Sequence, residues 1–584
     1  MTGDVYQSRP KFQPAAFLKV ILAGLLSAYL VAVILLCWVP PVSRDALTHH
    51  LAVPKLYLEH GGIYEIPSII FSYYPMNLDL LYMAALHLGS DIAAKYVHFS
   101  FALLTAWLVF WHLKRRLGSV WGLLGGLMFL GLPVIVKLSI TAYVDLGLIF
   151  FSTASLLFYL CWIEKQYRLK YLILAALFCG LALGTKYNGL VVFFLLALFV
   201  PFNYSRKEAG TGAIHHKGSG RKNVTTIRAL GYAGLFIFIS LLIYSPWMIR
   251  NWLWTNNPVY PLYRSYFNSE QIDAAGNVFE TVGEHASDGI RKPKRSLSPL
   301  VKRKVLFNES WWQAMLVPVR IFFQGKDDNP QFFDGKLNPY LFIFPLLALC
   351  FFSKDTSAVK TEKLNLLAFA VLYLIFTLFK ADMRMRYIAP IIPPLVILSV
   401  YGVHGVVAFI TSRYSPRTAR WGVSGVVAVC VLSFLPNAFY VYRLFDVVDP
   451  FSYIGGRLSR EAYIEKHRPE YPVLQYANSH LDYKDKILGL FIGKRRYYSD
   501  REIIFDTDLF RQVLSTAPSA DMVALDFHRA GVTHLLVRYD IFNNWAQAVF
   551  NGSEREKIRD FFKANLKLLF SKGGYGLYQL KISA

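Results

Sequence analysis

Hydrophobic residues are gathered along this chain into long runs that are separated by polar stretches rich in Lys and Arg. A helix needs roughly 20 apolar residues to cross the hydrocarbon layer of a bilayer. We place eleven such runs at residues 17–39, 92–113, 118–137, 145–163, 171–185, 187–203, 229–249, 338–352, 364–379, 387–410 and 421–442. The pattern predicts an α-helical polytopic membrane protein with about eleven transmembrane helices.

The basic clusters orient these helices, because cytoplasmic loops of membrane proteins are enriched in Lys and Arg. The clusters fall at residues 114–116, 165–170, 206–228, 354–363 and 413–420. All five clusters lie on the cytoplasmic side only if segment 171–203 crosses the membrane twice, as two short helices with a break near residues 184–189. Backbone groups freed by such a break need partners in the protein or in a wet cavity. The N-terminus is then cytoplasmic and the C-terminus lies on the outer, periplasm-like side.

The chain divides into a transmembrane domain, residues 1–442, and a soluble outer domain, residues 443–584. Two long outer loops, 40–91 and 250–337, belong to the first domain. In the second, apolar β-type runs predict strands at 488–492, 503–505 and 533–537, and an amphipathic helical pattern covers 553–566. We expect a small α/β domain there, and a disordered basic loop at 205–226.

Composition agrees with the membrane class and adds one alternative. Hydrophobic residues make up 55% of the 584 and charged residues 17%, against roughly 25% charged in soluble domains. The formal net charge of +24 is also compatible with nucleic-acid binding, but basic cytoplasmic loops account for it, so no nucleic-acid partner is predicted. All five cysteines lie in apolar runs, where we expect neither disulfides nor metal ligation.

A short basic loop, Lys380 to Arg386, is an exception to the rule that loops rich in Lys and Arg face the cytoplasm. The alternating path places it on the outer side, with three cations against one carboxylate. An anionic ligand at the membrane boundary, such as a lipid phosphate, would explain Arg384 and Arg386 there. Arg250 falls at the same predicted depth. The alternatives are a topology that is wrong by one crossing, or side chains that extend to lipid headgroups.

The first outer loop carries Asp45 and His49, which lie one turn apart if a helix begins there. A carboxylate just beyond the first membrane helix can act as a general base toward an acceptor hydroxyl or amine. The alternative is that Asp45 caps the helix that follows it. Asp145 lies at the outer end of another apolar run, and it too can be either a functional carboxylate or a helix cap. Lys186 is a lone cation near membrane depth, which makes it a functional candidate.

Several familiar chemistries find no support in the sequence. His49, His50, Glu59 and His60 lack a zinc-type spacing, and the chain has no phosphate-binding glycine loop, dinucleotide fingerprint or nucleophile elbow. We therefore predict no cofactor and no bound metal, although a divalent metal remains compatible with the chemistry, and no direct use of ATP or a nucleotide sugar.

Taken in order, five stretches resemble the GT-C superfamily of integral membrane glycosyltransferases, closest to the glycosyltransferase family 39-like branch of protein O-mannosyltransferases and lipid A aminoarabinose transferases. The resemblance covers roughly residues 15–410. It rests on the first-loop Asp45 and on Tyr74-Pro75-Met76-Asn77-Leu78, Tyr143-Val144-Asp145, Gly180-Leu181-Ala182-Leu183-Gly184-Thr185-Lys186 and Arg386-Tyr387-Ile388-Ala389-Pro390-Ile391-Ile392-Pro393-Pro394.

The resemblance implies transfer of a sugar from a polyprenyl-phosphate-linked donor, in a GT-C-type fold, to a lipid, glycan or protein acceptor at the outer face of a bacterial inner membrane. It makes Asp45 the base or acceptor-orienting group and Asp145 a second acidic residue beside the site. Lys186, Arg384 and Arg386 fall near the lipid phosphate. The further candidate substrate-binding residues are His49, Lys55, Tyr74, Arg250 and Tyr387.

Two departures from the family pattern affect the donor. Ala46 follows Asp45 where many members have Glu, and Tyr74-Pro75-Met76 stands where many have Lys-Pro-Pro. The phosphate-contacting lysine is then missing or is supplied elsewhere, by Lys55 for example. The alternative functions are a transporter or flippase of polyprenyl-linked glycans, for which internal inverted repeats are lacking, and an inactive scaffold whose outer domain binds a partner.

Overall fold

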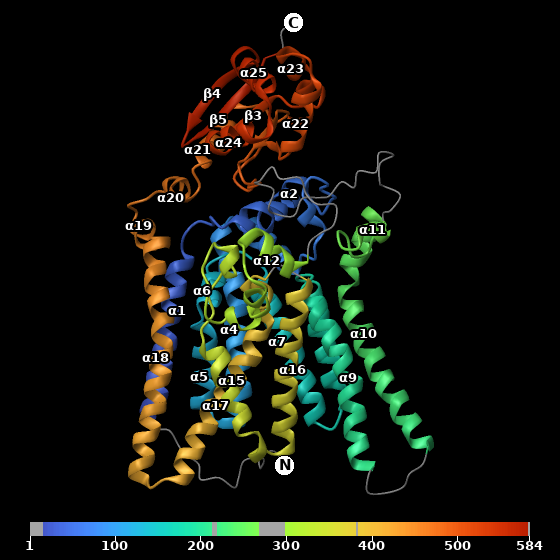
Figure 1. Ribbon diagram of the computed structural model, residues 1–584, viewed down its shortest axis with the longest axis vertical. Helices are drawn as coiled ribbons and strands as arrows, with labels where there is room; N and C mark the ends of the chain where they lie inside the picture. Colours follow the sequence, from blue (N-terminus) through green and yellow to red (C-terminus); the bar gives the residue numbers. More distant parts are fainter. Residues whose placement is uncertain (1–15, 213–218, 268–297, 381–382, 582–584) are drawn as a thin grey trace.

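The long helices run side by side along the longest axis of the molecule, and a sheet-containing domain sits at one end of them (Figure 1). The computed structural model describes residues 16–212, 219–267, 298–380 and 383–581. The predicted fold class, a polytopic helical membrane protein with a small C-terminal α/β domain, is confirmed.

The bundle consists of helices that coincide with the apolar runs of the sequence. They are α1 (Ala16–Cys37), α4 (Asp91–Leu117), α5 (Ser119–Leu130), α6 (Pro133–Ser139), α7 (Asp145–Glu164), α8 (Leu169–Leu183), α9 (Gly189–Gly212), α10 (Ser219–Thr255), α15 (Tyr340–Cys350), α16 (Ser357–Lys380), α17 (Ile392–Arg413) and α18 (Pro416–Val448). Among the described residues, eight are long and apolar enough to cross a membrane, and α5 with α6, bent by 68°, forms a ninth candidate span. The helices α8 and α15 are apolar but shorter.

The predicted break between α8 and α9 is present, and protein groups satisfy its backbone. The Asn77 amide N–H donates to the Gly184 carbonyl at 2.9 Å, and the Asn77 side chain donates to the Leu181 carbonyl at 3.3 Å. A Cβ on Gly184 would lie 2.3 Å from the Asn77 side-chain nitrogen. The break thus fits against the start of α3 (Asn77–His87), and only glycine leaves room for that contact.

The expected disordered loop at 205–226 is wrong for most of its length. The helix α9 continues to Gly212 and α10 already begins at Ser219, while residues 213–218 lie outside the described residues. Lys, Arg and Glu are good helix formers, so a helix can continue past the apolar run that defines its membrane segment.

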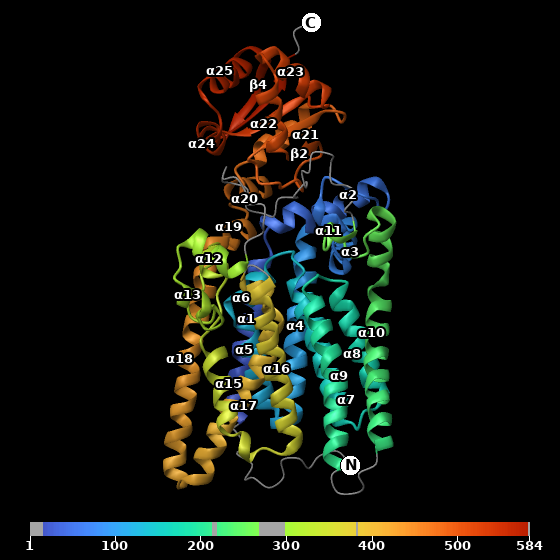
Figure 2. The same cartoon turned by 45° about the vertical axis from the view of Figure 1, so that its right-hand side comes forward.

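Short helices and irregular segments collect at the bundle end nearest the C-terminal domain (Figure 2). They comprise η1 (Ala46–His50), α2 (Ala52–His60), η2 (Ile70–Tyr73), α3, α11 (Arg264–Phe267), α12 (Pro299–Phe307), α13 (Trp311–Met315), α14 (Val317–Arg320), η4 (Pro330–Phe332), η6 (Met385–Tyr387) and η7 (Ala389–Ile391). The turn η5 (Phe352–Lys354) joins α15 to α16. The two predicted long loops therefore contribute ordered structure to one end of the bundle.

Beyond α18, the helices α19 (Pro450–Ile454) and α20 (Arg460–His467) lead into a five-stranded sheet of order β2-β1-β3-β5-β4. Its strands are β1 (Lys486–Leu490), β2 (Glu502–Ile504), β3 (His534–Arg538), β4 (Leu566–Lys572) and β5 (Tyr575–Leu580). The helices around it are α21 (Tyr471–His480), α22 (Thr507–Thr516), α23 (Ala520–Arg529), α24 (Tyr539–Val549) and α25 (Gly552–Asp560), with η8 (Phe561–Asn565) before β4.

Three of these strands were predicted, each within two residues of its observed position. They form the parallel part of the sheet, with β1 between β2 and β3. The antiparallel hairpin β4–β5, which pairs with β3 through β5, was not predicted. Its first strand alternates imperfectly and has a bulge between Leu568 and Phe570, so a period-two pattern is hard to recognise there.

The C-terminal domain is fixed to the bundle through the loop between β1 and β2. The backbone N–H groups of Arg496 and Tyr497 both donate to the Leu47 carbonyl in η1, each at 3.1 Å. On the same side, Arg460 forms an ion pair with Asp91, the first residue of α4, and the Tyr497 hydroxyl donates to that carboxylate at 3.2 Å. The domain therefore rests directly on the first outer loop.

Candidate active site

Three cations surround the ring of Tyr387 at the bundle end that faces the C-terminal domain. Lys186 Nζ lies 5.2 Å from the ring centroid, and the guanidinium carbons of Arg384 and Arg386 lie at 5.8 and 5.3 Å. Lys186 comes from the break between α8 and α9, whereas the arginines come from the segment before α17. Of the basic loop that the sequence singles out, Ala381 and Asp382 lie outside the described residues.

Asp45 joins this cluster through an ion pair with Arg386. The carboxylate is buried, at 8% exposure, and burial by itself would raise its pKa. The neighbouring Arg386 charge, with His49, more than offsets burial and holds the pKa of Asp45 below its ordinary value. Asp45 has helical backbone angles and its side chain makes no capping hydrogen bond, so the capping alternative is wrong.

His49 lies beside Asp45 in the same buried surroundings. Its ring stacks on Phe71 with centroids 4.2 Å apart. Burial, followed by the charge of His50, lowers the pKa of His49 well below its usual range, so the imidazole is neutral at pH 7. Its Nδ1 has no hydrogen-bond partner among the described residues. A neutral imidazole with an unused nitrogen can accept or donate one hydrogen bond to a ligand.

Asp145 and Lys186 form a second buried ion pair, with 2.8 Å between carboxylate oxygen and ammonium. Asp145 is the first residue of α7 and makes no capping hydrogen bond, since Val144 holds the cap position. The other carboxylate oxygen of Asp145 has no partner within the part of the chain that the structure describes. The positive end of the α7 dipole nevertheless favours a carboxylate at this position.

Arg250 and Tyr74 border the cluster on the side of α10. The Arg250 guanidinium lies between Trp247 and Trp254, 4.7 and 4.9 Å from their rings, and donates to the Tyr74 carbonyl at 3.1 Å. The Tyr74 ring in turn contacts Tyr187, the neighbour of Lys186, at 5.1 Å between centroids. One terminal nitrogen of Arg250 is buried without a partner among the described residues.

Lys55 occupies a different place from the one expected. Its ammonium donates to the backbone carbonyls of Tyr497 and Ser499, at 3.1 and 3.0 Å, and lies 2.7 Å from the Asp500 carboxylate. The lysine therefore connects α2 to the C-terminal domain instead of joining the cluster around Tyr387. Its long side chain and its position in the first loop did not indicate this, because the contact spans more than 440 residues of sequence.

Two contacts of the cluster were not predicted. The Tyr143 ring lies 5.5 Å from the Arg386 guanidinium, and the Asp334 carboxylate lies 3.8 Å from an Arg384 nitrogen. Tyr143 precedes Asp145 by two residues, so its position beside that motif was the available signal. Asp334 lies in the second long loop among other acidic residues, and no local pattern distinguishes it.

The cluster is suited to an anionic ligand. Besides the cations around Tyr387, Arg386 Nε and one Arg250 nitrogen are buried donors without partners among the described residues. Buried donors of this kind are costly unless a ligand or water satisfies them. Arginine binds phosphate and carboxylate groups through charge-assisted hydrogen bonds, while Asp45 and Asp145 add two carboxylates at the same place.

Solved membrane-protein structures share this fold, and part of the chain matches a known family model. The family model described as dolichyl-phosphate-mannose-protein mannosyltransferase matches residues 81–215. ArnT from Cupriavidus metallidurans bound to undecaprenyl phosphate superposes with a TM-score of 0.56 at 14% identity, covering 97% of this chain and 98% of that chain. The apo state of ArnT from the same organism superposes with a TM-score of 0.55 at 12% identity, covering 96% of this chain and 97% of that chain.

A more distant likeness extends to an archaeal enzyme. The oligosaccharyltransferase of Archaeoglobus fulgidus tethered with an acceptor peptide has a TM-score of 0.51 at 9% identity, covering 94% of this chain and 74% of that chain. No curated protein sequence matches this chain. The predicted resemblance is confirmed for the fold, which the chain shares with ArnT, and residues 81–215 match the mannosyltransferase family model.

Proposed function

We propose that this protein is a membrane glycosyltransferase that moves a sugar from a polyprenyl-phosphate-linked donor to a lipid, glycan or protein acceptor. The observation that carries the proposal is the convergence of Asp45, Asp145, Lys186 and Arg386 around Tyr387. These residues come from four separate parts of the sequence. The fold shared with ArnT bound to undecaprenyl phosphate supports the choice of a lipid-phosphate donor.

In this proposal the cations stabilise the leaving group. Breaking the bond between the sugar and its lipid phosphate develops negative charge on a phosphate oxygen. Positive groups fixed before the reaction are usually the largest source of catalysis in such a step. Lys186, Arg384 and Arg386 supply them, and Arg250 provides a further buried guanidinium.

Asp45 is the proposed base or orienting group for the acceptor. Its low pKa keeps it ionised at neutral pH, so it can accept a hydrogen bond or a proton but cannot donate one. When a lipid phosphate competes for Arg386, the carboxylate loses part of the charge that lowers its pKa and becomes more basic. Donor binding would thereby prepare the base for the acceptor.

The proposal places the protein in a bacterial inner membrane, with the N-terminus cytoplasmic and the site and C-terminal domain on the outer face. The basic clusters at the helix ends support this orientation. The donor would then approach from the lipid layer at the bundle end that carries Tyr387, and the acceptor from the aqueous side.

Replacing Asp45 with Asn tests the proposal. Purified protein in lipid nanodiscs is given a panel of polyprenyl-phosphate sugars and candidate acceptors, and transfer is followed with a radiolabelled sugar. Asp45→Asn should lower kcat by about 100-fold or more, which is typical for loss of a general base.

The matched control is Asp449→Asn. Asp449 pairs with Lys466 on the surface and has a left-handed backbone, φ +50°, that Asn tolerates. The control should transfer at the unchanged rate. Wild-type turnover by Asp45→Asn would refute the catalytic assignment, and ATP-free movement of an intact lipid-linked glycan without transfer would favour a flippase.

A further inference from the structure

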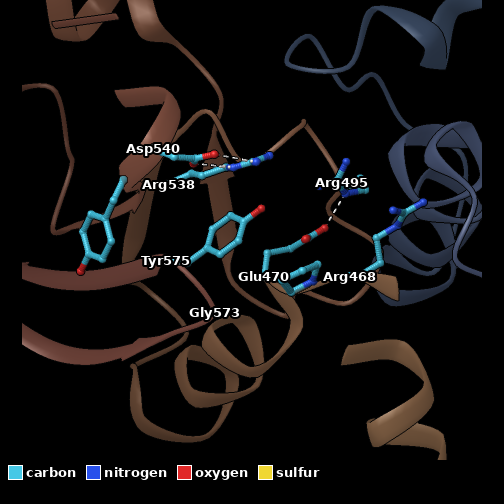
Figure 3. Close-up of a pocket in the computed structure, with 10 residues that line it drawn as sticks. Arg468, Glu470, Arg495, Arg538, Asp540, Gly573 and Tyr575 are labelled. Atoms are coloured by element: carbon cyan, nitrogen blue, oxygen red, sulfur yellow. Dashed lines mark hydrogen bonds and ion pairs between the residues drawn. The ribbon is translucent and has the colours of Figure 1, made fainter. Parts of the chain in front are cut away.

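A cavity of about 580 Å³, lined largely by charged residues, lies in the C-terminal domain (Figure 3). Four parts of that domain line it: the segment between α20 and α21, the loop after β1, the end of β3 and the β4–β5 turn. A volume of several hundred cubic ångströms is in the range of small-molecule sites. The cavity is therefore large enough for one or two sugar residues.

Positive charge exceeds negative charge in this cavity. Arg495 pairs with Glu470, and Arg538 holds Asp540 through two hydrogen bonds of 2.8 and 2.9 Å. Arg468 forms no ion pair with any described residue, and its Nε is buried without a hydrogen-bond partner among them. Burial, followed by the Arg495 charge, lowers the pKa of Arg468, and the nearby Glu470 carboxylate offsets only part of this effect.

The cavity also offers groups for the uncharged part of a sugar. Glu470 is 2% exposed, and its Oε2 has no partner within the described part of the chain. That oxygen can accept a hydrogen bond from a hydroxyl. The Tyr575 ring lies between Glu470 and Arg538 in the view of Figure 3 and presents an apolar surface next to them. Aromatic faces with polar groups around them suit ligands that are partly apolar and partly hydroxylated.

The position of the cavity ties it to the candidate active site. Arg496 and Tyr497, which follow the cavity residue Arg495, both bind the Leu47 carbonyl. Leu47 is two residues from Asp45 in the same short helical segment. In Figure 3, Arg468 and Arg495 lie on the side of the cavity that faces the blue ribbon of the N-terminal part of the chain. The loop that lines the cavity thus continues directly into the residues that bind the segment of the proposed base.

We propose that this cavity binds an acidic sugar of the acceptor, with a carboxylate or phosphate on Arg468, hydroxyl groups on Glu470 and the sugar ring against Tyr575. The inference rests on the proposed function and narrows it, since it assigns an anionic glycan group to the acceptor. Arginine recognises carboxylate and phosphate through the same charge-assisted hydrogen bonds, so both chemistries enter the test.

Direct binding to the full chain in nanodiscs tests the inference without any transfer reaction. The probes are D-glucuronate, D-glucose 1-phosphate and neutral D-glucose, followed by saturation-transfer NMR. At least one anionic sugar should bind about tenfold more tightly than glucose, which is the effect of one charge-assisted hydrogen bond. Arg468→Gln should abolish that preference. Arg559→Gln removes the same charge from an exposed position on α25 and should leave the preference unchanged.

Three results would overturn the inference: glucose binding as tightly as both anionic sugars, an unaltered preference in Arg468→Gln, or an equal loss in Arg559→Gln. If Arg468→Gln does not fold, Arg468→Lys is used in its place. Lysine lacks the planar guanidinium group, so this variant should still bind the anionic sugar more weakly. Asp45→Asn should bind all probes as the wild type does. If Asp45→Asn still transfers sugar at the wild-type rate, the proposed function is refuted. If Asp45→Asn is inactive but Arg468→Gln keeps the preference for anionic sugars, only the acceptor site is refuted.

Discussion

Arg386 is the residue on which the charge balance of the candidate site depends. It pairs with Asp45, lies against the rings of Tyr143 and Tyr387, and keeps one buried nitrogen without a partner among the described residues. Because its charge opposes the effect of burial on Asp45, the ionisation of the proposed base depends on it. A single side chain therefore links lipid-phosphate binding to the basicity of the carboxylate.

Replacing Arg386 with Gln should change both properties. With the cation removed, burial dominates and the pKa of Asp45 rises, so the acid limb of the pH–kcat profile moves to higher pH. The KM for the lipid-linked sugar should increase by about tenfold, the value of one charge-assisted hydrogen bond, with a smaller effect on the acceptor.

Steady-state kinetics over a series of acidic to slightly alkaline pH values provide the measurement. Arg443→Gln, at an exposed position on α18, is the matched control and should keep the wild-type profile. An acid limb that does not move, or equal losses in the KM of donor and acceptor, would contradict phosphate binding at Arg386.

At the scale of elements, the break between α8 and α9 positions Lys186. Residues 184–189 leave the helix at the bundle end, and the start of α3 closes the gap through Asn77. Trp247 of α10 donates to the Asn77 side chain at 2.8 Å. Three helices are thus joined at one asparagine, which holds the Lys186 turn in place opposite Asp145.

Gly184→Ala should disturb this junction. The new Cβ would lie 2.3 Å from the Asn77 side-chain nitrogen, so Asn77 must move and lose its bonds to Leu181 or Trp247. We expect a loss of about 1–3 kcal/mol in stability, typical of overpacking, together with a lower transfer rate.

Gly231→Ala in α10 is the control, because no atom lies within 4 Å of its Cβ position. Alanine favours helix over glycine, so this variant should be neutral or slightly more stable. Thermal unfolding in detergent and the transfer assay measure both effects. A Gly184→Ala protein as stable and active as Gly231→Ala would show that the junction does not position the site.

At the scale of the whole molecule, the C-terminal domain is held on the bundle by a buried carboxylate. Asp91 is 6% exposed and binds both Arg460 and the Tyr497 hydroxyl. Lys55 adds bonds to the same loop from α2. The loop that carries Arg495 is therefore fixed against the segment that carries Asp45, which keeps the acceptor cavity and the candidate active site in one arrangement.

Asp91→Asn should loosen this arrangement, because it leaves the Arg460 charge without a counter-ion. We expect about 2 kcal/mol of weaker docking, less than the full cost of breaking a buried pair because Arg460 is partly exposed. Hydrogen exchange of residues 494–500 should become faster while exchange in β1 and β3 stays slow.

The control is Lys572→Ala, which removes a surface pair with Glu465 in the same part of the molecule. Such exposed pairs contribute about 0–1 kcal/mol, so exchange at 494–500 should not change. Faster exchange throughout the sheet in Asp91→Asn would instead indicate unfolding of the domain, and unchanged exchange at 494–500 would contradict the role of Asp91 in docking.

The elements that could be predicted from the sequence are those whose signal is local. Apolar runs of membrane length, the glycine-containing break before Lys186 and the short apolar strands β1 to β3 all depend on residues close together in the chain, so hydrophobic periodicity identifies them. The first-loop Asp45 and the basic pair Arg384 and Arg386 were also found locally, because charged residues at membrane boundaries stand out against apolar surroundings.

Which of these residues contact one another depends on how the chain packs in three dimensions. The pairing of Asp45 with Arg386 and the contact of Lys55 with the C-terminal domain join residues more than 300 positions apart. The cavity of the C-terminal domain likewise brings together four separate segments of that domain. Ion pairs and hydrogen bonds act over a few ångströms, and the distance between two side chains is set by how the helices pack. A linear pattern records the presence of a charge but not its partner.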